Sequence, residues 1–350
     1  MTIKKVLVVD DSAFMRKVIS DMLNHDPRLE VIAAARNGTD AIAKCQTHKP
    51  DVVTLDIEMP VMDGLTALEE IKEKYAIPVV MLSSLTAEGA DSTVKAMQLG
   101  AVDFIQKPSG SISLDIDTIR EQIVDKVVAA ANANMRGIVS RQPIKTAVKS
   151  INLKKRGTDR KRIVAIGTST GGPRALQQVL THLPADFPAP IVIVQHMPPG
   201  FTKSLADRLN SISSITIKEA SEGEILQDGT AYIAPGNFHM TLDKHGAGLS
   251  IRLDQSAPMN GHRPSVDALF HSIALLKEYI PTTVVMTGMG SDGAKGLEKL
   301  RQAIPNTYTI TESEDSAVVF GMPKAVINKG MTDKTVPLSD ISTTILDTFE

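Results

Sequence analysis

The sequence offers little material for covalent cross-linking, and it lacks long apolar runs. Only one cysteine, Cys45, occurs among the 350 residues, and tryptophan is absent. A single thiol excludes a disulfide framework and a cysteine-based metal site, so we expect Cys45 to be a buried core residue on a helix. The first apolar run, Val6–Val9, is far too short for a signal peptide or a membrane span.

An excess of charge of one sign is also missing. The formal net charge is −2, with 22% charged and 42% hydrophobic residues, so no overall field attracts nucleic acid or an anionic membrane. This composition is ordinary for a globular protein. We therefore expect a soluble cytoplasmic monomer that binds no nucleic acid and does not insert into membranes.

The first 130 residues alternate between short apolar runs and segments with helical spacing. The runs that predict strands are Val6–Asp10, Glu30–Ala35, Asp51–Asp56, Pro78–Ser83 and Ala101–Ile105. Strands that alternate with helices form parallel sheets covered on both faces. We therefore predict a doubly wound, five-stranded parallel domain over residues 1–130.

A basic segment separates this domain from the rest of the chain. Between Arg136 and Arg162 there are ten lysines or arginines and a single acid, Asp159. A basic arm for nucleic acid is one interpretation, but no aromatic residue interleaves the charges. Charge without core-forming residues favours a flexible linker, which we place at residues 131–160.

Residues 161–350 return to alternating strands and helices. Strands are predicted at Arg162–Gly167, Ile191–Gln195, Ile215–Ile217, Thr283–Thr287 and Thr307–Thr311. Between Thr230 and Leu253 the helical spacing lapses. Three short runs separated by Pro-Gly-Asn and His-Gly-Ala-Gly predict antiparallel hairpins, namely Ala231–Ala234, His239–Leu242 and Leu249–Leu253. The expected fold is a Rossmann-like α/β domain with an antiparallel hairpin insertion.

Acidic and hydroxyl residues follow the predicted strands of the first domain. Asp10, Asp11, Asp56, Ser83 and Lys107 all fall at strand ends that share one sheet edge. Three carboxylates there repel one another unless a hard cation such as Mg²⁺ joins them, so we expect a metal site at Asp10, Asp11 and Asp56. Lys107 and Ser83 suit an incoming phosphoryl group, and Asp56 can accept it.

For any one of these residues, helix capping is an equally good explanation. The whole set, together with Lys107-Pro108 and the segment Leu55–Gly64, closely resembles the receiver domain of two-component response regulators. The resemblance spans about residues 1–125. It implies that a partner histidine kinase phosphorylates Asp56 and that Ser83 and Phe104 form a switch pair, although Phe104 alone would be read as a core residue.

Ser169 is the most informative residue of the second domain. It lies between the apolar run Ile163–Gly167 and a helical pattern that starts after Gly171-Gly172-Pro173. Proline is favoured at a first helical position. Ser169 therefore falls on a tight strand-to-helix turn, and the spacing of glycines around it fits a nucleophile elbow.

Two further residues complete a nucleophilic arrangement at the same predicted sheet edge. His196 follows the strand Ile191–Gln195, and Asp292 follows the strand that ends near Thr287. Imidazole can take the proton of a serine hydroxyl, and a carboxylate behind it fixes its tautomer. The N–H groups of the Ser169 turn and of Gly288-Met289-Gly290 can stabilise an oxyanion.

Other interpretations of these residues stay open on the motifs alone. The glycine-rich turn could cradle a phosphate or a dinucleotide, although no Gly-Lys-Ser/Thr or matching ribose acid is evident. His239 and His262 are rival bases. Asp292 could simply cap the helix that begins near Gly293.

Six motifs of the second domain resemble the chemotaxis protein-glutamate methylesterase family. They are Gly167–Gly172, Gln195–Thr202, Ala234–Met240, His262–Asp267, Thr287–Gly293 and Val319–Pro323. The resemblance implies that Ser169, His196 and Asp292 are the catalytic residues and that the backbone at Thr170 and Met289 supports the oxyanion. It implies no cofactor in this domain.

With the receiver in front, the family resemblance covers nearly the whole chain except the linker. It implies a phosphorylation-regulated hydrolase of bacterial chemotaxis, which removes methyl esters from glutamates of methyl-accepting chemoreceptors, releases methanol and deamidates receptor glutamines. A chemotaxis histidine kinase would donate the phosphoryl group. The alternatives are a receiver-linked transcriptional regulator and a nucleotide-binding effector.

Overall fold

The structure is a computed structural model that describes residues 2–84, 86–107, 116–135, 161–246 and 248–350, without the side chains of 116–119. The chain divides into two compact units, residues 1–138 and 139–350. Pro108 and residues 136–160 of the expected linker lie outside the described residues.

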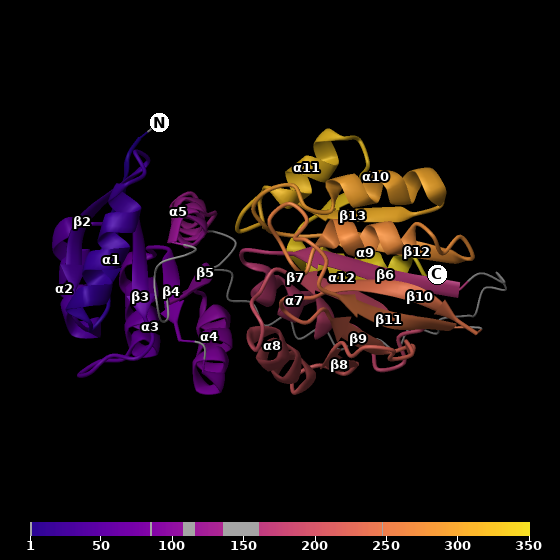
Figure 1. The fold of residues 1–350 in the computed structure, drawn as a ribbon, viewed down its shortest axis with the longest axis horizontal. Helices are drawn as coiled ribbons and strands as arrows, with labels where there is room; N and C mark the ends of the chain where they lie inside the picture. Colours follow the sequence, from indigo (N-terminus) through magenta and orange to yellow (C-terminus); the bar gives the residue numbers. More distant parts are fainter. Residues whose placement is uncertain (1, 85, 108–115, 136–160, 247) are drawn as a thin grey trace. The chain divides into compact units, whose positions relative to one another are not determined.

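The N-terminal unit is built on a five-stranded parallel sheet with the strand order β2-β1-β3-β4-β5 (Figure 1). Its strands are β1 (Lys4–Val9), β2 (Leu29–Ala35), β3 (Val52–Asp56), β4 (Val79–Ser83) and β5 (Asp103–Gln106). The central strands are buried on both faces, which explains their continuous apolar runs. The five predicted strands are confirmed.

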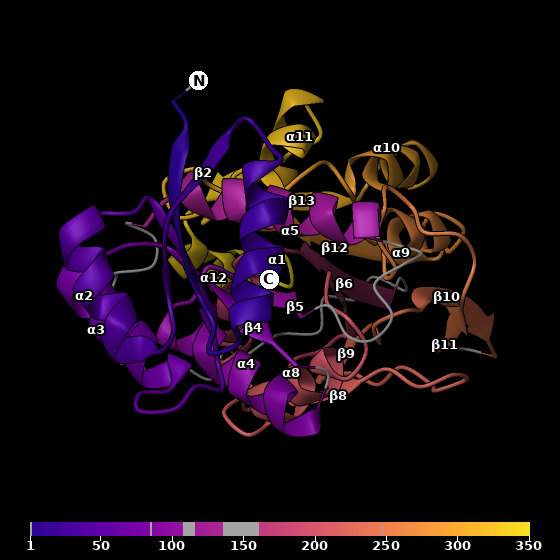
Figure 2. The ribbon, with the colours of Figure 1, turned by 60° about the vertical axis from the view of Figure 1, so that its left-hand side comes forward.

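Among the residues described in this unit, five helices cover the sheet. They are α1 (Ala13–Asn24), α2 (Gly38–His48), α3 (Gly64–Tyr75), α4 (Ala87–Leu99) and α5 (Ile116–Ala131). Helix α1 packs with α5, whereas α2, α3 and α4 pack in a row, and α2 and α3 lie side by side in both views (Figures 1 and 2). Cys45 is buried on α2 as expected, and burial raises the pKa of its thiol to about 11.

The C-terminal unit contains a seven-stranded parallel sheet with the strand order β14-β13-β12-β6-β7-β9-β8. Its strands are β6 (Lys161–Thr168), β7 (Ile191–Gln195), β8 (Thr216–Glu219), β9 (Thr230–Ile233), β12 (Tyr279–Val285), β13 (Tyr308–Glu312) and β14 (Lys334–Val336). Strand β6 lies in the middle of the sheet: the chain adds β7 on one side of it and later adds β12 on the other side, so the strand order reverses there. In open parallel sheets, ligand sites form at such a reversal.

In the described part of this unit, six α-helices and one short 3₁₀ helix surround the second sheet. They are α7 (Gly172–Leu180), α8 (Phe201–Asn210), α9 (Val266–Ile273), α10 (Ala294–Ala303), α11 (Met322–Asn328), η1 (Leu338–Asp340) and α12 (Ile341–Asp347). Helix α10 packs against α9 and α11, and α7 packs against α8 and α12. Figure 1 shows α9 and α10 side by side beside β12.

The hairpin insertion is present but smaller than predicted. Strands β10 (His239–His245) and β11 (Gly248–Asp254) form a two-stranded antiparallel ribbon that packs on α9 (Figure 2). The prediction that Ala231–Ala234 forms a hairpin strand is wrong. Residues 231–233 belong to β9, which pairs in parallel with β7 and β8. Strand β14 was not predicted. Among the described helices, none has the length and apolarity needed to cross a membrane.

Gly64 shows how closely the chain approaches itself at a strand end. Its N–H donates to the carbonyl of Ile57, and a Cβ atom at this position would lie 2.0 Å from the carbonyl oxygen of Asp56. No side chain fits there, so the loop after β3 can fold back onto the strand only with glycine. This close approach positions Asp56 at the sheet edge.

We predict that Gly64→Ala lowers the free energy of unfolding of the N-terminal unit by about 1–3 kcal/mol, because backbone must move to admit the methyl group. Urea unfolding measures the effect. Gly248→Ala is the matched control, since a Cβ there lies 3.7 Å from its nearest neighbour. The explanation is contradicted if Gly64→Ala lowers the free energy of unfolding of the N-terminal unit by no more than Gly248→Ala lowers that of the C-terminal unit.

Candidate functional site

The carboxyl edge of the first sheet brings together two buried carboxylates and one lysine. Asp56 is the last residue of β3, and Asp10 directly follows β1. The Lys107 ammonium lies 2.7 Å from Asp56 Oδ2 and 2.9 Å from Asp10 Oδ2. The Lys107 N–H also donates to the Ser83 carbonyl at 2.8 Å, which fixes the lysine at the end of β4.

Burial and charge act in opposite directions on these groups. Burial raises the pKa of Asp56 to about 6, although the hydrogen bond and positive charge of Lys107 lower it. Burial lowers the pKa of Lys107, but hydrogen bonds to Asp56 and Asp10 outweigh it and keep that pKa above its ordinary value. The pocket thus holds an ammonium beside a carboxylate that is costly to keep charged.

The three predicted metal ligands do lie together. Oxygen atoms of Asp10, Asp11 and Asp56 all lie within 4.8 Å of one another. Carboxylate oxygens are the ligands that Mg²⁺ prefers, and the cation would also offset the repulsion between these acids. The residues present therefore fit a magnesium ion.

Ser83 and Phe104 take different positions near this pocket. Ser83 lines a small cavity with Asp56 and Lys107, while its hydroxyl accepts a hydrogen bond from Thr93 at 2.7 Å. Phe104 is buried in β5 with its ring 4.9 Å from the Lys126 ammonium. Ser83 thus lies at the acidic pocket, whereas Phe104 is a core residue.

The second sheet places Ser169 on the turn between β6 and α7, as predicted. Gly171 has φ +78°, a left-handed conformation that favours glycine, and Pro173 lies in the first turn of α7. The side chain of Gln195 holds the turn: its amide donates to the Ser169 carbonyl at 2.9 Å, and its oxygen accepts from Thr168 at 2.6 Å. Neighbouring strand ends therefore fix the serine backbone.

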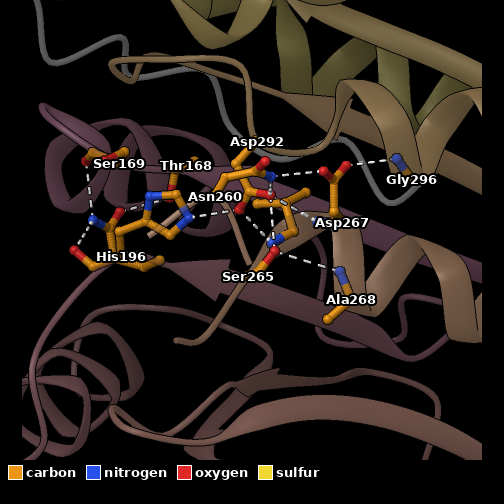
Figure 3. A network of polar contacts seen from close by, with 11 residues as sticks. Thr168, Ser169, His196, Asn260, Ser265, Asp267, Ala268, Asp292 and Gly296 are labelled. Atoms are coloured by element: carbon orange, nitrogen blue, oxygen red, sulfur yellow. Dashed lines mark hydrogen bonds and ion pairs between the residues drawn. The ribbon is translucent and has the colours of Figure 1, made fainter. Parts of the chain in front are cut away.

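His196 and Asp292 form a buried pair. The imidazole Nε2 lies 2.9 Å from Asp292 Oδ2, and the two side chains are 6% and 1% exposed. A carboxylate can only accept, so Nε2 must carry the proton of this bond. In neutral imidazole, Nδ1 is then the acceptor. Figure 3 shows Ser169 on the side of the ring away from Asp292.

The expected hydrogen bond between serine and histidine is not formed in the described part of this structure. Nδ1 of His196 is buried and has no hydrogen-bond partner, so no hydrogen bond joins it to Ser169 among the described residues. Catalytic hydrogen bonds are often long before substrate binds. The imidazole is thus held by Asp292, and within the residues that the structure describes its accepting nitrogen stays without a partner on the side of Ser169.

Asp292 is held by groups from a helix distant in sequence. Its carboxylate accepts the N–H groups of Val266 and Asp267 at 2.7 and 3.1 Å, at the N-terminus of α9. The interpretation that Asp292 caps the helix after Gly293 is wrong, because α10 has no side-chain cap. Its position instead places the anion at the positive end of α9.

Hydrogen bonding keeps this acid ionised. Burial alone would raise the pKa of Asp292, but the hydrogen bond and charge of His196, the Val266 N–H and the Ser265 hydroxyl outweigh burial and hold the pKa well below its ordinary value. Asp292 therefore stays anionic and keeps accepting from the imidazole across the physiological pH range.

Two residues of this network were not singled out from the sequence. The Asn260 amide bridges Asp267 and Asp292 at 2.8 and 3.0 Å, and the Ser265 hydroxyl donates to Asp292 at 2.8 Å (Figure 3). Ser265 lies in the motif His262–Asp267, which carries the family resemblance, so a signal was present without a role. Asn260 has φ +52° and lies in a loop that gives no such signal.

The rival histidines occupy different places. The His262 ring stacks on His196 with a centroid separation of 3.9 Å, so it belongs to the site. His239 is buried in β10, and its Nε2 lies 3.2 Å from the Ala257 carbonyl. His196 is the histidine whose bond to the buried carboxylate of Asp292 is seen directly.

The Gly288–Met289 turn approaches the serine closely. A Cβ atom on Gly288 would lie 2.8 Å from the Ser169 Cβ, so glycine allows the two turns to touch. Met289 is half-buried and follows directly, and Thr170 is buried next to Ser169. The two positions expected to support an oxyanion therefore lie on adjoining turns.

We predict that Asp292→Asn lowers the free energy of unfolding of the C-terminal unit by about 1–3 kcal/mol near pH 7, because buried N–H donors lose a charged acceptor. Folding lowers the pKa of Asp292, so its stabilising contribution is complete above the ordinary value of 3.8 and is lost as the pH falls toward the folded value.

The difference between wild type and Asp292→Asn should therefore shrink below pH 3.8. Urea unfolding at a series of pH values measures it, and Asp186→Asn, at an exposed aspartate, serves as the control. A difference that is absent at pH 7, or that does not change with acidification, would contradict the assignment.

Comparison with known proteins agrees with these observations. The family described as CheB methylesterase matches residues 164–345, and the response regulator receiver domain matches residues 6–117. The crystal structure of the Thermotoga maritima CheB methylesterase catalytic domain is 45% identical, with a TM-score of 0.52, over 54% of this chain and 98% of that one.

Full-length relatives extend this similarity to both units. Proteins named protein-glutamate methylesterase/protein-glutamine glutaminase are 54% identical in Oceanobacillus iheyensis, over 98% of both chains, and 50% identical in Bacillus subtilis, over 97% of both chains. The chain therefore belongs to the CheB methylesterase family, with a response regulator receiver domain preceding the methylesterase domain.

Proposed function

We propose that this protein is a phosphorylation-regulated protein-glutamate methylesterase and protein-glutamine glutaminase of bacterial chemotaxis. Its substrates are methylated glutamates and glutamines of chemoreceptors. The observation that carries the proposal is the buried Asp292–His196 pair with its accepting nitrogen on the side of Ser169. The relatives support this function, and not a transcriptional or nucleotide-binding one.

The proposed chemistry starts at Ser169. Its Oγ attacks the ester carbonyl carbon while His196 Nδ1 takes the hydroxyl proton, and the carbonyl becomes a tetrahedral oxyanion supported by the backbone at Thr170 and Met289. His196 then protonates the departing methoxide as methanol. Water, deprotonated by the same nitrogen, cleaves the serine ester and restores the glutamate carboxylate.

Asp292 acts through the imidazole in this scheme. It holds Nε2–H, keeps Nδ1 as the acceptor and stabilises the imidazolium that forms after proton transfer. Glutamine follows the same course because an amide also passes through a tetrahedral oxyanion, with ammonia as the leaving group. No cofactor is needed in this domain.

Residues 1–130 form the proposed regulatory receiver, joined by residues 131–160 to the catalytic domain at 161–350. Asp56 accepts the phosphoryl group from a chemotaxis histidine kinase, and Ser83 with Phe104 forms the switch pair. Asp10, Asp11 and Asp56 would hold Mg²⁺, which supplies positive charge for phosphate oxygens. Lys107 supplies a second positive charge within reach of Asp56.

We predict that Ser169→Ala lowers methanol release from methylated receptor by more than about 1,000-fold, as expected for loss of a serine nucleophile, with receptor binding retained. Ser339→Ala, at an exposed serine of η1, should keep wild-type activity. Substantial turnover by Ser169→Ala would assign the nucleophile elsewhere.

Phosphorylation should accelerate the esterase. With Mg²⁺ and a small phosphodonor such as acetyl phosphate, we expect methanol release by the full chain to rise by about fivefold or more, the scale of typical coupling between sites. Asp56→Asn should abolish the rise without changing the basal rate, and chelating Mg²⁺ should do the same.

Asp91→Asn, which alters an exposed aspartate on α4, is the matched control and should respond like wild type. If Asp56→Asn responds as strongly as this control, the phosphoacceptor is a different residue.

A further inference from the structure

Thr287 connects the serine turn to the segments around it. Its carbonyl accepts the Ser169 N–H at 3.0 Å, and its hydroxyl donates to the Thr170 carbonyl at 2.8 Å. The same hydroxyl accepts the Val319 N–H at 3.0 Å, and the Thr287 N–H donates to Glu312 at 2.8 Å. The hydroxyl, the N–H and the carbonyl of this buried residue thus all form hydrogen bonds to other segments of the chain.

Because of its position in the chain, Thr287 links the turn that carries Ser169 to the turn that follows Thr287 itself. Thr287 immediately precedes Gly288 and Met289, the turn that lies against Ser169. Its two bonds to the Ser169–Thr170 turn therefore fix the distance between the two turns. The ladder between β6 and β12 continues into this region, since the Met286 N–H donates to the Gly167 carbonyl at 3.0 Å.

We propose that Thr287 is a positioning residue for the esterase reaction, whose hydroxyl holds the Ser169–Thr170 and Gly288–Met289 turns in the spacing that the oxyanion requires. This inference rests on the proposed function, since it assigns both turns to the oxyanion. It adds a residue that touches neither substrate nor the reacting atoms.

Glu312 supports Thr287 from the end of β13. Its carboxyl is buried and accepts from the Thr287 N–H at 2.8 Å and from the Ser316 hydroxyl at 3.0 Å. The Arg174 side chain of α7 is the charged group that interacts with it. A buried carboxyl group that accepts two hydrogen bonds has a fixed orientation. Glu312 therefore restrains the Thr287 backbone, in addition to the bonds that Thr287 makes to the two turns.

The size of the expected effect follows from geometry. A displacement of about 1 Å between reacting groups can cost about 100-fold in rate. Loss of the Thr287 hydroxyl removes the bond to the Thr170 carbonyl and the interactions with the Val319 N–H and carbonyl, while the backbone bond to Ser169 remains. The two turns should then move partly apart, but the backbone N–H groups at Thr170 and Met289 are both still present. Such a displacement should lower kcat more than it weakens substrate binding.

The test compares three full-length variants in the methanol-release assay. Thr287→Val removes the hydroxyl with little change of shape, and we expect kcat to fall about 10- to 100-fold with KM within about threefold of wild type. Thr287→Ser keeps the hydroxyl and should recover kcat to within about threefold. Thr287→Ala, which also lacks the hydroxyl, gives the same test if the valine variant does not fold.

Thr283→Val is the matched control for a purely structural effect. Thr283 is a buried threonine of β12 whose hydroxyl donates to Thr309 at 3.0 Å, so its loss should lower thermal stability and leave kcat unchanged. The proposal is overturned if Thr287→Val keeps the kcat of this control, or if Thr287→Ser is as slow as Thr287→Val. Ser169→Ala is assayed beside them to distinguish failure of the Thr287 proposal from failure of the proposed function. Full activity of Ser169→Ala would contradict the proposed function itself.

Discussion

The functional half of this protein depends on one buried negative charge. Removing a carboxylate from water costs several kcal/mol unless hydrogen bonds replace the lost hydration. For Asp292 the replacement comes from the N-terminus of α9, the Ser265 hydroxyl, the Asn260 amide and the His196 imidazole. The strand end after β12, the start of α9 and the end of β7 must therefore meet at one point, and their meeting orients the imidazole toward Ser169.

Both units apply the same rule of parallel sheets to different chemistry. Strand ends at one edge gather residues that are distant in sequence. In the receiver unit, Asp56 and Lys107 meet at such an edge and form a charged pocket that suits a phosphoryl group and a cation. In the methylesterase unit, the edge gathers Ser169 and His196, and a helix N-terminus stabilises the acid behind them. In both units the sheet fixes the positions of the polar side chains, which lie at the strand ends or directly after them.

The features that the sequence predicts are those set by local pattern. Buried strands read as apolar runs, and the residues that follow them must share an edge, so the order of strands and polar residues along the chain is enough to assign Asp56, Ser169 and His196 to strand ends. Strands toward the edges of the sheet are harder: β9, next to the edge strand β8, resembles a hairpin strand, and the edge strand β14 has three residues. Their pairing is decided by distant partners. The contacts of Asn260 and Thr287 depend on loop conformation and on segments that meet only after folding. No local pattern therefore predicts these contacts, although Thr287 opens the motif Thr287–Gly293.

The central claim is that Asp292 fixes His196 with its proton on Nε2 and its accepting lone pair on Nδ1. Nitrogen-15 NMR of labelled histidine in the full chain tests this most directly, because the two tautomers give distinct nitrogen shifts and proton couplings. The account predicts the Nε2–H tautomer for the neutral His196 ring, with a strongly deshielded Nε2 proton that Asp292→Asn removes. A neutral ring protonated on Nδ1 would contradict it, since the nitrogen facing the serine could then not accept its proton.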